Sequence, residues 1–147
     1  MEEQRFERLF IPVHLWIAMQ AHVEKEAPIE ACGILGGNQS GVDLQAQLIF
    51  PARNELHSAH RYRMDAHDQL DAFNQLEEVG LDMVGIYHSH PQGPSTPSIM
   101  DIKEAYYPDA VYLIWAFDGM KWDCRGYSIQ VGVVQEIPVI VNTTMPD

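Results

Sequence analysis

A short apolar run that leads directly into two histidines is the feature that most constrains this chain. Residues 83–87 are typical of a buried β-strand, and His88 and His90 follow one residue apart. Side chains alternate between the faces of a strand, so both imidazoles are expected on the same side. A turn rich in proline, glycine and serine comes next, and Ser98 and Asp101 then open a new segment. We therefore expect the chain to return a carboxylate to two histidines at a strand end.

Two imidazoles and one carboxylate form a ligand set that suits zinc. Three protein ligands leave a fourth tetrahedral position open to water, which is the pattern of catalytic rather than structural zinc sites. Two other interpretations stay open at this point. Histidines at a strand end are often polar rim residues, and Ser98 with Asp101 also fits a helix N-terminus with Ser98 as the N-cap. A helix start and a metal site are compatible, because a capped helix supports a carboxylate rigidly.

The spacing of these residues resembles the signature of a known family. His-x-His, seven residues, Ser, two residues and Asp form the pattern of the JAMM (MPN+) metalloproteases, which include deubiquitinating enzymes and small prokaryotic proteins. The family pattern also has an upstream glutamate before a short apolar strand with glycines, and Glu30 with residues 31–37 matches it. No position departs from the pattern. The chain is too short for the insertions of larger relatives, so it resembles a minimal, prokaryotic-type member.

The resemblance implies a fold, a cofactor and residue roles. The implied fold class is α/β, a mixed sheet flanked by helices with the cytidine deaminase-like architecture of MPN/JAB domains, in a single domain over residues 1–147. His88, His90 and Asp101 are the implied zinc ligands. Glu30 is the implied general base, which takes a proton from water and later passes it to the leaving amine. Ser98 is the implied hydrogen-bond donor to the developing oxyanion.

The resemblance also implies a substrate class. Family members hydrolyse amide or isopeptide bonds after the Gly-Gly tail of ubiquitin or a ubiquitin-like protein. A narrow cleft beside a sheet edge suits such a tail, because an extended peptide can add as a strand, and residues 92–97 are the expected wall. Two alternatives stay open. One is release of cysteine or another small amine from a ubiquitin-like sulfur-carrier protein, and the other is a non-catalytic scaffold, a type that in this family has lost metal ligands.

Composition and charge exclude other classes of function. The chain has 147 residues, of which 46% are hydrophobic and 20% charged, so it is long enough for one globular domain. A net charge of −12 argues against binding to nucleic acids or anionic membranes. Residues 1–5 lack the apolar segment of a signal peptide, and no run is long enough to span a membrane. We therefore expect a cytoplasmic protein.

Some cysteines and histidines lie outside the motif. Cys32 and Cys124 are too few for a disulfide framework and are expected to be buried. On a strand, Cys32 would share the face of Glu30 and line the site. His57 and His60 lie in a polar segment, residues 54–63, which is expected to be a surface loop or an edge strand. A second metal site there has no third ligand at a useful spacing.

Hydrophobic periodicity predicts the remaining elements. In the first half we expect a helix over residues 10–27, strands over 30–35 and 42–50 separated by a turn at 38–41, and a helix from Asp65 to Gly80 whose inward residues are Ala66, Leu70, Phe73 and Leu76. In the second half we expect a short helix to about residue 107, strands over 110–117 and 122–130 joined by a tight turn, and one or two strands over 131–141 interrupted near Pro138. Residues 142–147 are expected to be frayed.

Overall fold

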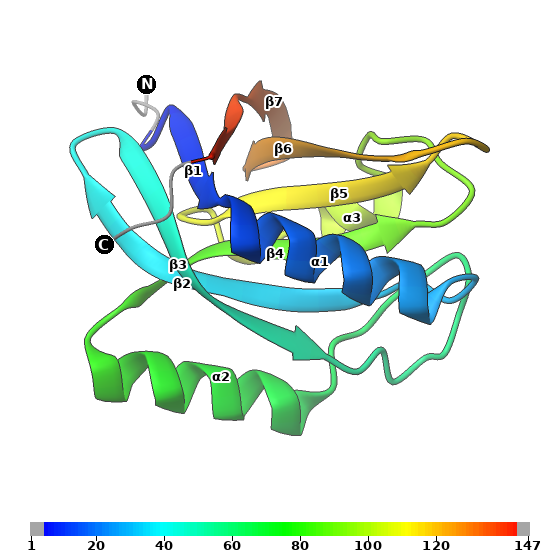
Figure 1. Ribbon diagram of the computed structural model, residues 1–147, viewed down its shortest axis with the longest axis horizontal. Coiled ribbons are helices and arrows are strands. Elements are labelled where there is room, and N and C mark those ends of the chain that lie inside the picture. The colour runs from blue at the N-terminus through cyan, green and yellow to red at the C-terminus, as the bar shows by residue number, and fades with distance from the viewer. Residues whose placement is uncertain (1–4, 144–147) are drawn as a thin grey trace.

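The computed structural model describes residues 5–143, which are built around one eight-stranded mixed sheet (Figure 1). The strands are β1 Arg8–Pro12, β2 Cys32–Ser40, β3 Asp43–Ala52, β4 Asp82–His90, β5 Val111–Phe117, β6 Trp122–Gln130, β7 Val133–Ile137 and β8 Val139–Asn142. Within this range the helices are α1 Val13–Glu26, α2 Ala66–Val79 and α3 Ile99–Lys103. A mixed sheet flanked by helices confirms the predicted fold class. No helix within residues 5–143 has the length and apolar character needed to cross a membrane.

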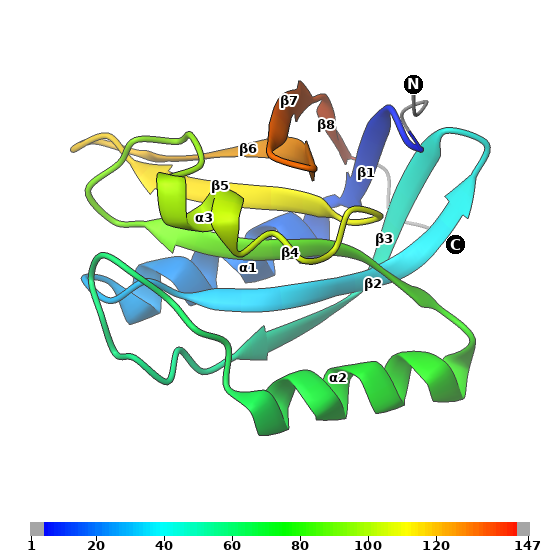
Figure 2. The same ribbon diagram turned by 180° about the vertical axis from the view of Figure 1, so that it is seen from behind.

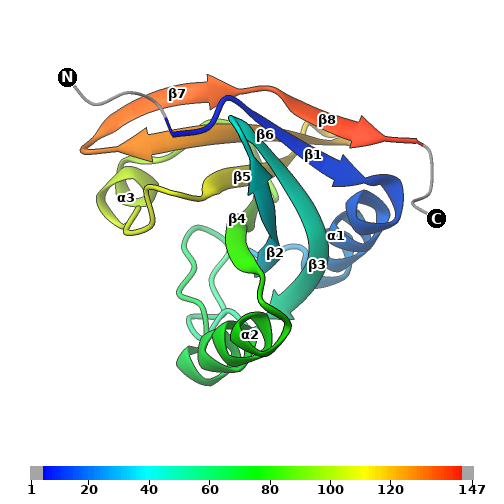
Figure 3. The ribbon, with the colours of Figure 1, turned by 90° about the vertical axis from the view of Figure 1, so that its left-hand side faces the viewer.

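The two edges of the sheet are formed by one continuous stretch of chain. The strand order is β7-β6-β5-β4-β2-β3-β1-β8, so β7 and β8 lie at opposite ends. They follow each other in sequence with only Pro138 between them, and the Pro138 carbonyl accepts a hydrogen bond from the Leu9 amide. Figure 3 shows the sheet curled, with β7 and β8 in line along one side. This stretch therefore closes the sheet into a roll.

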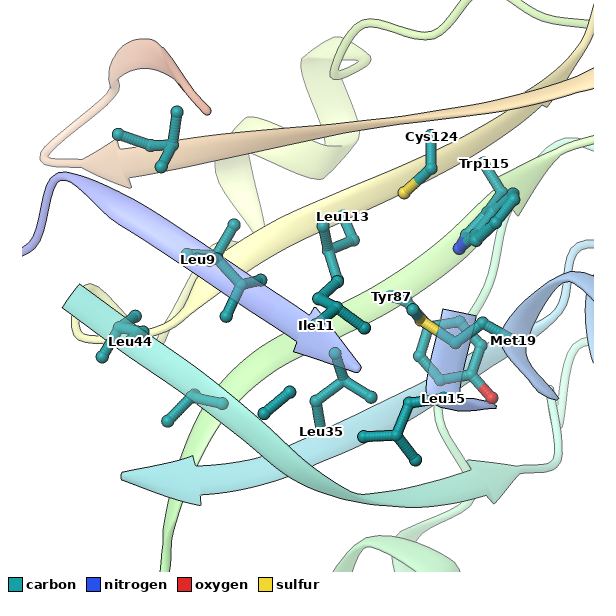
Figure 4. Close-up of a cluster of buried hydrophobic side chains, with 14 of the residues drawn as sticks. Leu9, Ile11, Leu15, Met19, Leu35, Leu44, Tyr87, Leu113, Trp115 and Cys124 are labelled. Carbon is teal, nitrogen blue, oxygen red and sulfur yellow. The ribbon is translucent and has the colours of Figure 1, made fainter. Parts of the chain in front are cut away.

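The interior of the roll contains the largest hydrophobic cluster, and α1 packs against it. Buried residues of α1 meet side chains from most of the strands, and the labelled members in Figure 4 are Leu9, Ile11, Leu15, Met19, Leu35, Leu44, Tyr87, Leu113, Trp115 and Cys124. Tyr87 and Ser89 of β4 are fully buried. Because side chains alternate along a strand, His88 and His90 point to the opposite face from Tyr87.

That opposite face of the sheet is covered by α2 and α3. Figure 2 shows α3 in front of β4 and β5, and α2 alongside β2. Ala72 and Leu76 of α2 pack against Ile34 of β2 in a second buried cluster, while a third cluster forms on β4, β5 and β6 beneath Ile102 of α3. His88 and His90 of β4 therefore lie on this face, next to Ile86 of the third cluster.

Glycines in β2 allow the neighbouring chain to approach closely. A Cβ atom on Gly33 would lie 2.3 Å from the Tyr87 ring, and one on Gly37 would lie 1.8 Å from the Gln45 carbonyl oxygen. The register also shifts at this place, between Gly36 and Gly37 against β3. The absence of side chains here is a packing requirement.

Several predicted boundaries were wrong for identifiable reasons. The first helix begins at Val13 and not at residue 10, because Leu9 to Pro12 pair with β8 as a strand. The strand expected over 30–35 begins at Cys32, so Glu30 lies just before it. It also continues to Ser40 through the expected turn, because β3 pairs with it up to that residue. These differences arise from pairing between distant segments, which local periodicity does not contain.

The predicted helix capping was right, but one helical face was wrong. Asp65 caps α2 by accepting a hydrogen bond from the Asp68 amide, and Gly80 ends the helix in the left-handed conformation. Leu70 is 57% exposed, however, and Ala66 is exposed as well, so the inward face consists of Ala72 and Leu76 with part of Phe73.

In the second half, most predicted elements are confirmed. The short helix ends at Lys103 and not near residue 107. The buried strand, the hairpin that follows it and the interruption at Pro138 are all present as predicted. The expected frayed end was wrong at Asn142, which pairs with Pro12 as the last residue of β8. Residues 144–147 lie outside the described residues, as do residues 1–4.

Candidate metal centre

Three potential ligand atoms form a nearly equilateral triangle at the end of β4. The Nε2 atoms of His88 and His90 lie 3.1 Å apart, and one carboxylate oxygen of Asp101 lies 3.2 Å from each. His88 is 1% exposed and His90 is 8% exposed. The structure thus brings together the three residues that the sequence predicted as ligands.

The triangle has the size that a tetrahedral zinc ion needs. With Zn–N and Zn–O bonds of about 2.0–2.1 Å, tetrahedral geometry separates the ligand atoms by about 3.3–3.4 Å. The Nδ1 atom of His90 lies 2.7 Å from the Pro94 carbonyl oxygen. A carbonyl can only accept, so Nδ1 donates this hydrogen bond, and in the neutral imidazole Nε2 has the lone pair that a metal ion would bind. The donor set and its geometry fit a zinc ion.

Asp101 is held in place by the start of α3. Ser98 Oγ accepts a hydrogen bond from the Asp101 amide, and the Ser98 amide donates to the same Asp101 oxygen that faces the histidines. This is a capping box, so the two interpretations of the Ser-x-x-Asp pattern hold together. Because Ser98 Oγ accepts the amide hydrogen bond, its own hydroxyl hydrogen remains available to donate.

Glu30 lies beside the triangle. It is 4% exposed, and one of its carboxylate oxygens lies within 4.8 Å of a ring nitrogen of both His88 and His90. The adjacent Ala31 amide donates to Ser89 Oγ at 2.8 Å, and the Ser89 amide donates to the Ala31 carbonyl at 3.0 Å. The residue between the two histidines therefore fixes the segment that contains Glu30.

Burial and neighbouring groups shift the pKa values of Glu30 and Asp101 in opposite directions. Burial raises the pKa of Glu30 to about 7, which His90 opposes and Asp101 assists. Burial alone would raise the pKa of Asp101, but hydrogen bonds with His88 and His90 hold it well below its usual range. A carboxylate with a pKa near 7 can both accept and return a proton at neutral pH, whereas Asp101 stays ionised.

The two histidines differ in the same respect. Burial lowers the pKa of His88 and outweighs its hydrogen bond with Asp101. Burial also acts to lower the pKa of His90, but Asp101, the Pro94 carbonyl and Glu30 together raise it above the ordinary value. His88 is therefore a neutral ligand at neutral pH, and His90 is the one that competes with protons.

A loop over residues 54–64 borders the site, and the sequence did not reveal its role. Asn54 is buried, and its side-chain amide donates to the carbonyls of Glu30 and Arg61. Its side-chain oxygen accepts from the amides of Leu56 and Arg63. The Tyr62 ring stacks on His88, with ring centroids 4.5 Å apart and an angle of 24° between the planes. A polar segment offers no periodic signal from which these contacts can be predicted.

A cavity of about 270 Å³ opens beside His90, and its lining includes Glu30, His60, His90, residues 92–94 and residues 96–98. The segment 92–97 forms the wall that the sequence predicted. It is held by the Pro94 contact with His90 and by the Tyr127 hydroxyl, which donates to the Ser95 carbonyl at 2.6 Å. Glu30, His90 and Ser98 thus border one space of the size of a substrate subsite.

The other cysteine and histidines that the sequence singled out lie apart from the group formed by Glu30, His88 and His90. Cys32 is buried and pairs across the sheet with His88, and burial raises the pKa of its thiol to about 12, so it stays protonated. Among residues 5–143, neither His57 nor His60 belongs to a cluster of side chains that could bind a metal ion. The segment around them is a loop, as one of the two predictions stated.

Comparison with known proteins decides the family. Residues 12–125 match the family described as prokaryotic homologs of the JAB domain. The chain belongs to this family. The JAMM resemblance is therefore confirmed, and the chain is a hydrolase of the JAMM type. Enzymes of the JAB family are generally zinc-dependent, and the cluster of Glu30 with His88 and His90 agrees with that chemistry.

Individual JAB relatives are similar along most of their length. The CysO-cysteine peptidase of Mycobacterium tuberculosis is 39% identical over 134 residues, which cover 90% of each chain. The desampylase of Pyrococcus furiosus is 34% identical over 139 residues, 93% of each chain. A solution structure of a protein from Desulfitobacterium hafniense superposes with a TM-score of 0.84 at 31% identity, covering 93% of this chain and 94% of that one.

Proposed function

We propose that His88, His90 and Asp101 bind a catalytic zinc ion, and that Glu30 and Ser98 complete a peptidase site. The observation that best supports this is the triangle of ligand atoms with the Glu30 carboxylate beside it. A zinc ion bound there supplies Lewis acidity and lowers the pKa of water to about 7. Protein side chains carry the proton and donate a hydrogen bond to the developing oxyanion.

Glu30 is the proposed proton carrier. Its carboxylate takes a proton from the water that attacks the amide carbon, and burial favours the protonated form that results. When the carbon–nitrogen bond breaks, the same carboxyl group returns this proton to the leaving amine. Burial suits both steps, because few competing water molecules reach a side chain that is 4% exposed.

Ser98 is the proposed donor to the oxygen that becomes negatively charged during attack. Ser98 lines the same cavity as His90, and its hydroxyl retains a hydrogen that can be donated. One such donor contributes about 10²–10³-fold to the rate in well-studied hydrolases. The capping box fixes the Ser98 backbone, which limits how far the hydroxyl can move.

The proposed substrate is a ubiquitin-like protein joined through a C-terminal Gly-Gly tail. Relatives named as a CysO-cysteine peptidase and a desampylase support substrates of this kind. The expectation that the tail adds to a sheet edge beside the ligands needs correction. β4 lies between β5 and β2, which occupy both of its hydrogen-bonding sides. The tail therefore approaches across the ends of the strands, along the wall of residues 92–97.

Two leaving groups fit the proposed chemistry. The first is the side-chain amine of a lysine in an isopeptide bond, as the resemblance implied. The second is a free amino acid such as cysteine, which is favoured by the 39% identity to a CysO-cysteine peptidase over 90% of both chains. Each reaction adds water across one amide bond and releases one carboxylate and one amine, so the same residues serve both.

Competition between two substrates tests the proposal. The zinc-loaded protein is mixed with equal amounts of one Gly-Gly-ending modifier, joined either to cysteine or to a lysine side chain, and both products are followed by mass spectrometry. We expect zinc-dependent release of at least one product, which chelation stops and added zinc restores. A preference for either adduct identifies the leaving group. Release that is unaffected by chelation, or no release of either product by the zinc-loaded protein, would contradict the proposal.

A further inference from the structure

The two histidines of the triangle are oriented in different ways. His90 is fixed by the hydrogen bond from Nδ1 to the Pro94 carbonyl. His88 is buried, and its Nδ1 atom has no hydrogen-bond partner among residues 5–143. Metal-ligating histidines almost always donate their second ring nitrogen to an oxygen, which fixes the plane of the ring. His88 therefore lacks the usual support.

The ring of Tyr62 occupies the face of His88. The two ring planes differ by only 24° and their centroids are 4.5 Å apart, which is the geometry of an offset stack. Rotation of the imidazole about its Cβ–Cγ bond would bring its edge into the phenol ring. We propose that Tyr62 is a positioning residue that orients His88 for metal binding in place of the missing hydrogen bond.

Stacking also suits the charge that the imidazole acquires. When Nε2 is a ligand, the ring proton is on Nδ1 and the ring becomes more positive. The face of a phenol ring attracts positive charge, and the attraction is strongest where water is excluded. The stack therefore favours the metal-binding form of His88, whose buried Nδ1–H has no acceptor. This inference rests on the ligand assignment in the proposed function.

The loop that contains Tyr62 is held firmly on both sides. The Asn54 side chain forms hydrogen bonds with the backbone of Leu56, Arg61 and Arg63. The Asn54 backbone pairs with that of Met64 in an isolated antiparallel β-bridge. On the other side, the Arg61 side chain pairs with Glu104, just after α3, at 2.9 Å. The loop therefore holds Tyr62 in place between Asn54 on one side and the end of α3 on the other, as a positioning residue requires.

Zinc affinity tests the inference directly. The dissociation constant is measured by competition with a chromophoric chelator for the wild type, Tyr62→Phe, Tyr62→Leu and the control Phe73→Leu. Phe73 is a partly buried aromatic residue of α2 that packs edge-on against Tyr107, outside the triangle. We expect Tyr62→Phe and Phe73→Leu to bind within about twofold of the wild type, and Tyr62→Leu to bind about 10–100-fold more weakly. Tyr62→Met repeats the test where Tyr62→Leu fails to fold.

A second measurement separates orientation from general loss of packing. In the zinc-loaded wild type, long-range nitrogen–proton NMR spectra should show one sharp set of His88 ring signals. In Tyr62→Leu, held at saturating zinc, these signals should broaden or double while those of His90 stay sharp. Unchanged affinity and unchanged His88 signals in Tyr62→Leu would overturn the role of Tyr62 but leave the ligands intact. Equal weakening by Phe73→Leu would also overturn it, whereas a wild type that binds no zinc would overturn the ligand assignment itself.

Discussion

At the scale of single residues, the site separates two carboxylates by their surroundings. Asp101 accepts hydrogen bonds from the Ser98 amide and has two imidazoles next to it, so its charge is stabilised. Glu30 is buried where a negative charge is disfavoured, which raises its pKa to about 7. One carboxylate is thereby suited to stay charged as a ligand, and the other is suited to exchange protons.

Glu30→Gln tests the proton-transfer role. The amide has nearly the same shape but cannot take a proton from water, so we expect turnover to fall at least about 10²-fold. Bound zinc, measured by atomic absorption, should stay near one ion per chain, because Glu30 is not a proposed ligand. The matched control is Glu77→Gln on the exposed side of α2, which should keep full activity. Wild-type turnover in Glu30→Gln would remove this residue from the mechanism.

Zinc affinity should depend on pH with a slope set by a single histidine. His90 has a raised pKa and must lose a proton before it binds the metal, whereas the pKa of His88 is lowered and Asp101 is already ionised. Affinity should therefore fall as the pH decreases from about 7.5 to about 5.5, approaching about tenfold per pH unit once His90 is mostly protonated. Calorimetry in buffers of different ionisation enthalpy checks this. Release of two protons per zinc at the acidic end by Glu30→Gln, in which the Glu30 carboxyl can contribute none, would show that both histidines titrate.

At the scale of elements, the loop over residues 54–64 depends on one buried side chain. Asn54 forms four hydrogen bonds, one of them to the Glu30 carbonyl. Asn54→Ala would leave buried donors and acceptors unpaired, so we expect a loss of about 1–3 kcal/mol in the free energy of unfolding and a lower turnover. Urea denaturation measures the first quantity. Asn74→Ala, at an exposed position of α2, is the control and should change stability by less than about 0.5 kcal/mol.

The site was more predictable than the elements around it. His88, His90, Ser98 and Asp101 lie together as expected, because strand alternation and helix capping are local features. Glu30 was expected beside them only from the family resemblance, because it lies far away in the sequence. The start of β2 and the extent of α1 were wrong, because pairing with β3 and β8 decided them. Tyr62 and Asn54 were missed for the same reason. Tyr62 stacks on a ring 26 positions away, and Asn54 donates to a carbonyl 24 positions away. Nothing in a polar loop indicates which distant residue it will meet.

At the scale of the whole molecule, β8 is the element that completes the roll. It pairs in parallel with β1 from Leu9–Val139 to Pro12–Asn142. Removing residues 139–147 should lower the free energy of unfolding by about 2–4 kcal/mol, since a few backbone hydrogen bonds at about 0.5–1.5 kcal/mol each are lost. Removing only residues 143–147 is the control and should have little effect. Equal urea midpoints for the two truncations would show that β8 contributes nothing to stability.

The two edge strands, β7 and β8, are consecutive in the sequence, and this affects how copies of the protein behave in concentrated solution. Unpaired edge strands are templates on which other chains assemble into fibres or aggregates. Here β7 and β8 are only five and four residues long, and Pro138 between them lacks the amide hydrogen that a strand of another chain would need. The arrangement should keep a protein with about two fifths of its described residues in one sheet from associating with copies of itself.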